Sequence, residues 1–188
     1  MTQTESEVRR RRSLNTTSRD MLISMTVIVG IVVALLLLVP RPNQIPERSI
    51  DVAAAAGAAQ QELGFVPADP QLSSGWTART ADVQRATDDL PTWHLTYTTP
   101  SGHYAGIQQA AKPTAAWENN QVTGGNPAQG TRVIGSTTWI VRSRLDRGIT
   151  SLVLREPAAG AGHPAITTVV TGTATDVELN QLALAVAP

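Results

Sequence analysis

Three histidines, His94, His103 and His163, carry the side chains best suited to proton transfer or metal binding near neutral pH. His94 and His103 are placed nearly symmetrically about a predicted turn, so they could face each other across a β-hairpin as two metal ligands. The sequence shows no third ligand, and no histidine has the His-Glu-x-x-His spacing. We therefore predict histidines that face solvent or form hydrogen bonds, with no bound metal and no cofactor.

The groups needed for common hydrolases are missing from the sequence. Gly-x-Ser-x-Gly is absent, and the only lysine, Lys112, is not part of a Ser-x-x-Lys motif. The absence of cysteine removes thiolate nucleophiles, disulfides and the usual structural zinc sites. Asp88 and Asp89 could act as general acid and base, but adjacent acids before Pro91 are more often solvated or cap a helix. We expect a protein that is not an enzyme, with an unrecognised hydrolase as the alternative.

Four tryptophans stand out in a chain with one Phe and two Tyr. Trp93 and Trp139 lie in the middle of predicted strands and are interpreted as core residues, with contact to sugar or lipid as the alternative. Trp117 lies on a short polar helix beside a turn-rich stretch and is the best candidate for an exposed contact. The Gly124-Gly125 pair is a weak phosphate-loop signal, because no Gly-Lys-Ser/Thr follows it. The predicted ligand or partner contacts are Trp117, Asn119, Asn120, Gly124 and Gly125.

The elements that must position these residues begin with a β-hairpin. Residues 92–99 (TWHLTYTT) alternate large apolar and polar side chains, which is typical of a half-buried strand. Residues 99–102 (TPSG) have the composition of a type I turn, so residues 103–110 should return as the partner strand. A short helix is predicted over 112–120, followed by a turn-rich loop over 119–130.

Helices are predicted at both ends of the segment over residues 49–188. An alanine-rich helix near residues 50–63 should be capped by Ser49 or Asp51 and end at Gly64. Thr175 and Glu178 form a capping box for a C-terminal helix, whose buried stripe is formed by Leu179, Leu182, Ala183 and Val186.

Further strand-like runs indicate an antiparallel meander between these helices. They begin at Trp76 and continue over 131–135, 137–143, 149–155 and 165–171, with short turns between them. The predicted fold is α+β, a mostly antiparallel sheet flanked by an N-terminal and a C-terminal helix. This order of elements is similar to the Mog1/PsbP-like fold, by analogy alone.

An uncharged run at residues 21–39 (MLISMTVIVGIVVALLLLV) precedes the domain. As a helix it would extend about 28 Å, close to the roughly 30 Å hydrocarbon core of a bilayer, so we predict one transmembrane helix. A cleaved signal peptide is the first alternative, but small residues come only at 53–56 and the run exceeds the length of a signal core. Twin-arginine export is the second, although four consecutive arginines at 9–12 produce such a pair by chance.

Charge predicts the orientation of this span. Arg9–Arg12 and Arg19 precede it, whereas only Arg41 and Arg48 follow within the next ten residues, so the N-terminus should be cytoplasmic and the C-terminal domain extracytoplasmic. We therefore expect a disordered cytoplasmic tail over 1–20, a transmembrane helix over 21–39, a Pro-rich spacer over 40–48 and one extracytoplasmic domain over 49–188 of a single-pass cell-membrane protein.

The charge of the external part argues against nucleic acid as a partner. Residues 44–188 contain nine basic and twelve acidic side chains, whereas phosphate binding requires a basic patch.

Several short motifs carry a family resemblance. They are residues 72–76 (LSSGW), Trp93, residues 98–104 (TTPSGHY), 108–110 (QQA) and 135–139 (GSTTW), behind an arginine-rich tail and one span. With these the chain resembles a family of actinobacterial single-pass membrane proteins of unknown function (DUF4245-like) over roughly residues 15–187. It departs from the family where Leu-Pro-x-Gly-Trp is replaced by Leu-Ser-Ser-Gly-Trp. The resemblance implies an actinobacterial envelope protein and supplies no catalytic residue.

The resulting functional expectation is a membrane-anchored, non-enzymatic interaction module that binds an envelope protein. The alternative is a binding module for an envelope lipid or glycan, suggested by the tryptophans and the 119–130 loop.

Overall fold

The computed structural model describes residues 21–35, 50–124, 127–160 and 163–187. The chain divides into two compact units, Met1–Glu47 and Arg48–Pro188. In the first unit, residues 21–35 are helical. The predicted tail, the spacer over 40–48 and the last four residues of the predicted span lie outside the described residues. Within the described part of the chain, no helix combines the length and the apolar character needed to cross a membrane.

The second unit begins with the predicted alanine-rich helix, α2 (Val52–Leu63). The Asp51 carboxylate accepts a hydrogen bond from the Ala54 N–H at 3.0 Å and caps its first turn. Gly64 ends it with a left-handed φ of 71°, a conformation that glycine adopts without steric cost. Ala56, Ala59 and Leu63 are buried, which places one side of α2 against the sheet.

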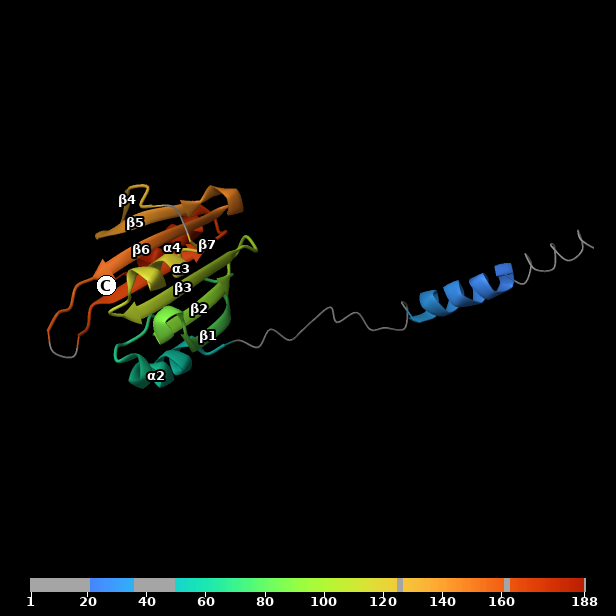
Figure 1. Ribbon diagram of the computed structural model, residues 1–188, viewed down its shortest axis with the longest axis horizontal. Helices are drawn as coiled ribbons and strands as arrows, with labels where there is room; N and C mark the ends of the chain where they lie inside the picture. The colour runs from blue at the N-terminus through green and yellow to red at the C-terminus, as the bar shows by residue number, and fades with distance from the viewer. Residues whose placement is uncertain (1–20, 36–49, 125–126, 161–162, 188) are drawn as a thin grey trace, which may run out of the picture. The chain divides into compact units, whose positions relative to one another are not determined.

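Seven strands form a single antiparallel sheet in the order β1-β2-β3-β7-β6-β5-β4 (Figure 1). Every neighbouring pair is antiparallel. The α+β class and the strand predictions are therefore confirmed. The strands are β1 (Thr77–Arg85), β2 (Pro91–Thr98), β3 (Tyr104–Ala111), β4 (Thr131–Ile134), β5 (Thr137–Arg144), β6 (Ile149–Glu156) and β7 (Ile166–Gly172).

The sheet consists of two meanders, β1-β2-β3 and β4-β5-β6-β7, rather than one. Pairing of β3 with β7 joins them, with Ile107 opposite Val170. At this junction a Cβ on Gly172 would collide with the backbone of Tyr104 and Ala105, so glycine lets the two strands approach closely.

The β2–β3 hairpin closes through the predicted turn. The Gly102 N–H donates to the Thr99 carbonyl at 2.9 Å, and Gly102 has a φ of 81°. The resulting register places Trp93 opposite Gln109 and Leu95 opposite Ile107.

Two helices cover one face of the sheet, α2 and α4 (Asp176–Val186), and this is called the α2/α4 face. The predicted capping box of α4 is present, and Leu179, Leu182 and Ala183 are buried as expected. The main core lies between these helices and the sheet, and its strand residues include Trp93, Leu95, Ile107, Trp139, Leu152 and Val170.

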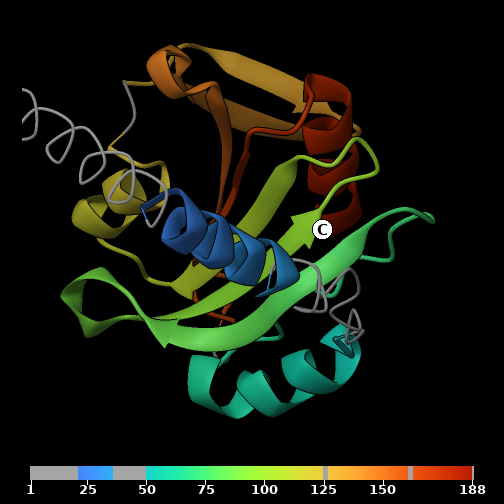
Figure 2. The same cartoon turned by 90° about the vertical axis from the view of Figure 1, so that its right-hand side faces the viewer.

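The short helix α3 (Ala115–Gln121) packs on the opposite face, called the α3 face. Figure 2 shows α3 and α4 on opposite sides of the sheet. The smaller core between α3 and the sheet consists of Ala110, Trp117, Val122, Val153 and Val169.

Candidate functional site

Helix α3 is fixed to the sheet by its first turn. Thr114 Oγ accepts a hydrogen bond from the Trp117 N–H at 3.0 Å and caps the helix. The Trp117 indole N–H donates to Thr92 Oγ at 2.8 Å, and the side chain is fully buried. The prediction of an exposed Trp117 is therefore wrong. A seven-residue helix needs a large apolar anchor, and Trp117 provides it against Val153 and Val169.

The next residue, Glu118, lies at the centre of a charged cluster. Its carboxylate accepts from Arg142 Nη1 at 3.1 Å and from Arg155 Nε and Nη2 at 2.8 and 2.9 Å. The side chains of Glu118 and Arg142 are both 11% exposed, whereas that of Arg155 is 60% exposed. The cluster therefore has a buried half, Glu118–Arg142, and a half that reaches solvent, Arg155.

The two arginines hold Glu118 in its charged form. Burial alone would raise the pKa of this carboxyl, but the hydrogen bonds and charges of Arg155 and Arg142 outweigh burial and lower the pKa overall. With two guanidinium groups and one carboxylate, the cluster carries one net positive charge. Glu118–Arg142–Arg155 is called the charged cluster below.

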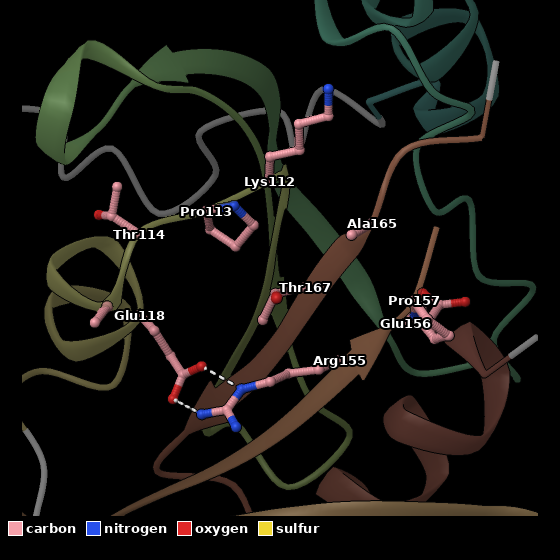
Figure 3. A pocket seen from close by; sticks show the side chains of 10 residues that line it. Lys112, Pro113, Thr114, Glu118, Arg155, Glu156, Pro157, Ala165 and Thr167 are labelled. Carbon is pink, nitrogen blue, oxygen red and sulfur yellow. Dashed lines mark hydrogen bonds and ion pairs between the residues drawn. The ribbon is translucent and has the colours of Figure 1, made fainter. Parts of the chain in front are cut away.

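A groove of about 500 Å³ lies beside the charged cluster. Figure 3 shows Lys112 at one end of it and the Glu118–Arg155 pair at the other. Between them lie small and apolar side chains, including Pro113 and Ala165. This α3 groove is lined by the start of α3 and the adjoining ends of β6 and β7, through Lys112, Pro113, Thr114, Ala115, Glu118, Arg155, Glu156, Pro157, Ala165 and Thr167.

The other predicted contact residues lie at the far end of α3. Asn119 is exposed, and its side-chain oxygen accepts from Arg142 Nη2 at 2.8 Å, so it adjoins the charged cluster. Asn120 donates a side-chain hydrogen bond to Thr87. Gly124 has a left-handed φ of 63° in the turn after α3, and Gly125 lies outside the described residues. Of the described residues among them, Asn119, Asn120 and Gly124, none lines the α3 groove.

His94 and His103 do not face each other. The hairpin register places His94 opposite Gln108, and the His103 carbonyl instead accepts from the Thr99 N–H. The two-histidine arrangement, which the sequence analysis set aside, does not form, because the hairpin is centred on Ser101, two to three residues beyond the midpoint of the two histidines. Burial lowers the pKa of His94, opposed by the charge of Asp82, whose carboxylate lies 4.0 Å from the imidazole.

Ser101, His103 and Glu178 form a cluster that the sequence did not predict. Ser101 Oγ lies 2.7 Å from His103 Nδ1 and 2.7 and 2.8 Å from the two Glu178 carboxylate oxygens. In a hydrolytic triad the acid orients the imidazole, and the imidazole takes the serine proton. Here the carboxylate contacts the serine itself and accepts a hydrogen bond from its hydroxyl. These contacts tether the β2–β3 turn to α4.

The same contacts set the acidity of Glu178. Its carboxylate also accepts the N–H groups of Ser101 and Thr175, at 3.1 and 3.0 Å. Burial would raise the pKa, but the hydrogen bonds outweigh it and bring the pKa of Glu178 to about 2.

Asp88 and Asp89 form structural contacts at the turn between β1 and β2. The Asp88 carboxylate accepts from the hydroxyl of Thr114, the cap of α3, and the Asp89 carboxylate pairs with Arg85 at 3.6 Å. Both aspartates have a left-handed φ, 62° and 55°, which Asp tolerates better than most residues. Their carboxylates thus help to hold the turn and α3 together.

Sequence reasoning missed the charged cluster because its members come from three elements. Glu118 lies on α3, Arg142 on β5 and Arg155 on β6, and only the β-sheet register brings them together. One signal was available. In β5 the side chains of Trp139 and Val141 face the main core, so the alternation along the strand places Arg142 on the α3 face. A charged side chain that is largely buried there requires a partner.

Comparison with known proteins identifies a family. A family model described as "Protein of unknown function (DUF4245)" matches residues 13–186. No curated protein matches the chain, and no solved structure matches it. The likeness to the Mog1/PsbP-like fold therefore remains an analogy from the order of the elements.

Proposed function

The chain belongs to this family of unknown function, as its sequence motifs predicted, and we propose that it is a membrane-tethered, non-enzymatic interaction module that binds another envelope protein through the α3 groove. The supporting observation is the groove itself. It combines a volume of about 500 Å³ with a charged side chain, Arg155, that is held in place yet 60% exposed. Concave sites with a few fixed polar groups are the usual places for recognition.

The hydrogen-bonding of the other polar clusters supports binding over catalysis. The Ser101 proton is directed to Glu178, and the Asp88 carboxylate accepts from the cap of α3. Neither carboxylate, Glu178 nor Asp88, is arranged to take a proton from a substrate, because each already accepts a structural hydrogen bond.

The main argument for the alternative, a lipid- or glycan-binding module, was the presence of the tryptophans, and their positions weaken it. Trp93, Trp117 and Trp139 are fully buried, and Trp76 packs edge-on against Tyr97 with ring centroids 5.9 Å apart. No aromatic side chain lines the α3 groove, so it offers no stacking surface for a sugar.

The membrane tether is supported by the uncharged run at 21–39 and the arginines before it. Because the chain has no cysteine, single cysteines can report its topology. A cysteine at Val177, which is 77% exposed, should react with an impermeant maleimide in intact cells, whereas one at Ser6 should react only after lysis. Equal labelling of both before lysis would exclude this topology.

Photo-crosslinking in native membranes tests the function. A benzophenone amino acid replaces Ala115, which is exposed and lines the groove, and Val177 on α4 serves as the control site. We expect one recurrent envelope protein among the adducts from position 115 and none from position 177. Adducts with lipid or glycan alone, or adducts no more abundant than at position 177, would contradict the proposal.

A further inference from the structure

We propose that the α3 groove recognises an acidic segment of the partner protein, with Arg155 and Lys112 binding its carboxylates. This inference rests on the proposed function and specifies the chemistry of the partner. It is argued from the charges at the two ends of the groove and from the side chains between them.

Arg155 has binding capacity left at its exposed end. Its Nε and Nη2 donate to Glu118, and no described residue accepts from Nη1. Glu118 therefore holds the guanidinium plane of Arg155 in one orientation. A planar, pre-oriented guanidinium loses little side-chain entropy when it binds a carboxylate.

Lys112 supplies the second positive charge. Its ammonium group is exposed and has no hydrogen-bond or ion-pair partner among the described residues. Its backbone is held in place, since the Lys112 N–H donates to the Ala165 carbonyl at 2.8 Å and continues the pairing of β3 with β7. The lysine therefore marks the end of the groove opposite Arg155.

Glu156 is the one groove carboxylate outside the charged cluster. It has no described basic partner, and burial raises its pKa. The charged side chains that line the groove balance, with Lys112 and Arg155 against Glu118 and Glu156, and Arg142 adds one positive charge outside the lining, next to Glu118. Attraction of an acidic partner therefore comes from the two exposed cations, Lys112 and Arg155, and Glu156 opposes it.

The middle of the groove favours a peptide over a lipid head group. Its apolar lining consists of prolines and alanines. Among the described residues of the domain, the exposed large hydrophobic side chains all lie elsewhere, and they are Val66, Tyr104, Val133, Val177 and Leu184. A bound lipid would find no large apolar surface beside the charges for its acyl chains, whereas a peptide needs only small flat contacts.

Peptide titration of the full chain in detergent micelles tests this inference, followed by amide NMR shifts. The probes are a capped hexapeptide of alternating Glu and Ala and its Gln/Ala counterpart. We expect the acidic peptide to shift the amide signals of the groove residues that carry an N–H, namely Lys112, Thr114, Ala115, Arg155, Glu156, Ala165 and Thr167. The Gln/Ala peptide should bind about tenfold more weakly, because each exposed ion pair contributes about threefold.

Charge variants make the test specific. Arg155→Gln and Lys112→Gln should each weaken binding of the acidic peptide about threefold, and Glu156→Gln should strengthen it about twofold. Arg147→Gln is the matched control, because Arg147 is exposed at the opposite end of β6 and should leave binding unchanged. Lys112→Gln keeps the inference testable if loss of Arg155 disturbs the fold.

The inference is wrong if the Gln/Ala peptide binds equally well, if shifts fall outside the groove or are absent, or if neither Arg155→Gln nor Lys112→Gln weakens binding. Micelles doped with phosphatidylglycerol that displace the acidic peptide would indicate a lipid phosphate instead. These failures are distinct from failure of the proposed function, because a recurrent protein adduct from position 115 would remain.

Discussion

The two faces of the β-sheet are built on different principles. On the α2/α4 face two helices cover a continuous core with fully buried side chains such as Trp93, Trp139 and Leu152. On the α3 face a single seven-residue helix covers a small apolar cluster and adjoins the charged cluster. The first face removes far more apolar surface from water, and hydrophobic stabilisation is proportional to that surface.

We infer from this difference that the α2/α4 face stabilises the domain, whereas the α3 face serves recognition. A buried ion pair contributes little net stability, because desolvation of both charges offsets their attraction. The Glu118–Arg142 pair is therefore poorly explained as a stabilising device for a domain that already has a core. Its position beside a groove, with Arg155 reaching solvent, fits recognition better.

The largest expected effect concerns the α2/α4 face. Trp139→Ala should lower the free energy of unfolding by about 3–5 kcal/mol, because it leaves a large cavity in the main core. Urea unfolding of the full chain in micelles, followed by far-UV circular dichroism, measures it. Trp76→Ala is the control and should cost clearly less, since Trp76 is only partly buried. Equal losses would refute the assignment of stability to this core.

A smaller and asymmetric effect is expected in the charged cluster. Arg142→Ala should cost about 2–3 kcal/mol of unfolding free energy, because it removes a buried partner of Glu118. Arg155→Ala should cost less than about 1 kcal/mol, since its side chain is 60% exposed. The same urea titration compares them. If Arg155→Ala were the more damaging variant, Arg155 would be a structural residue and the proposed role of the cluster would fail.

An effect smaller than that of Arg142→Ala is expected at Glu178, and it separates structural charge on α4 from the charge in the groove. Because the pKa of Glu178 is about 2 in the folded chain, below its ordinary 4.5, its contribution is complete above about pH 5 and is lost as the pH falls towards 2. Glu178→Gln should cost about 1–2 kcal/mol at pH 7 through loss of the charge-assisted hydrogen bonds. Between pH 5 and 2, the free energy of unfolding of Glu178→Gln should fall less steeply than that of the unmodified chain. An unchanged slope would show that Glu178 does not drive the acid response; some slope should remain from Glu118, whose pKa is also lowered.

The sequence predicted the features that depend on local signals. The capping box of Thr175 and Glu178, the turn over 99–102 and the alternation in β2 are each encoded within a few residues. These signals predicted the α+β class and most element boundaries. They could not predict that β3 pairs with β7, because the pairing joins segments about sixty residues apart.

The candidate site was predicted less well for the same reason. Trp117 was predicted as an exposed contact but is fully buried, because the direction of its side chain depends on which face of the sheet receives α3. The partners of Glu118 come from β5 and β6, and those of Glu178 come from the β2–β3 turn. Contacts of this kind follow from topology and register, which local patterns do not encode.

The most direct test of the account measures binding and stability on one variant, Lys112→Gln/Arg155→Gln. The two measurements are the yield of protein adducts from the crosslinker at position 115 in native membranes and the urea midpoint of the purified chain. The account predicts that the yield falls at least threefold while the free energy of unfolding changes by less than about 1 kcal/mol. An unchanged adduct yield, or a yield that falls only in proportion to the folded fraction, would contradict it.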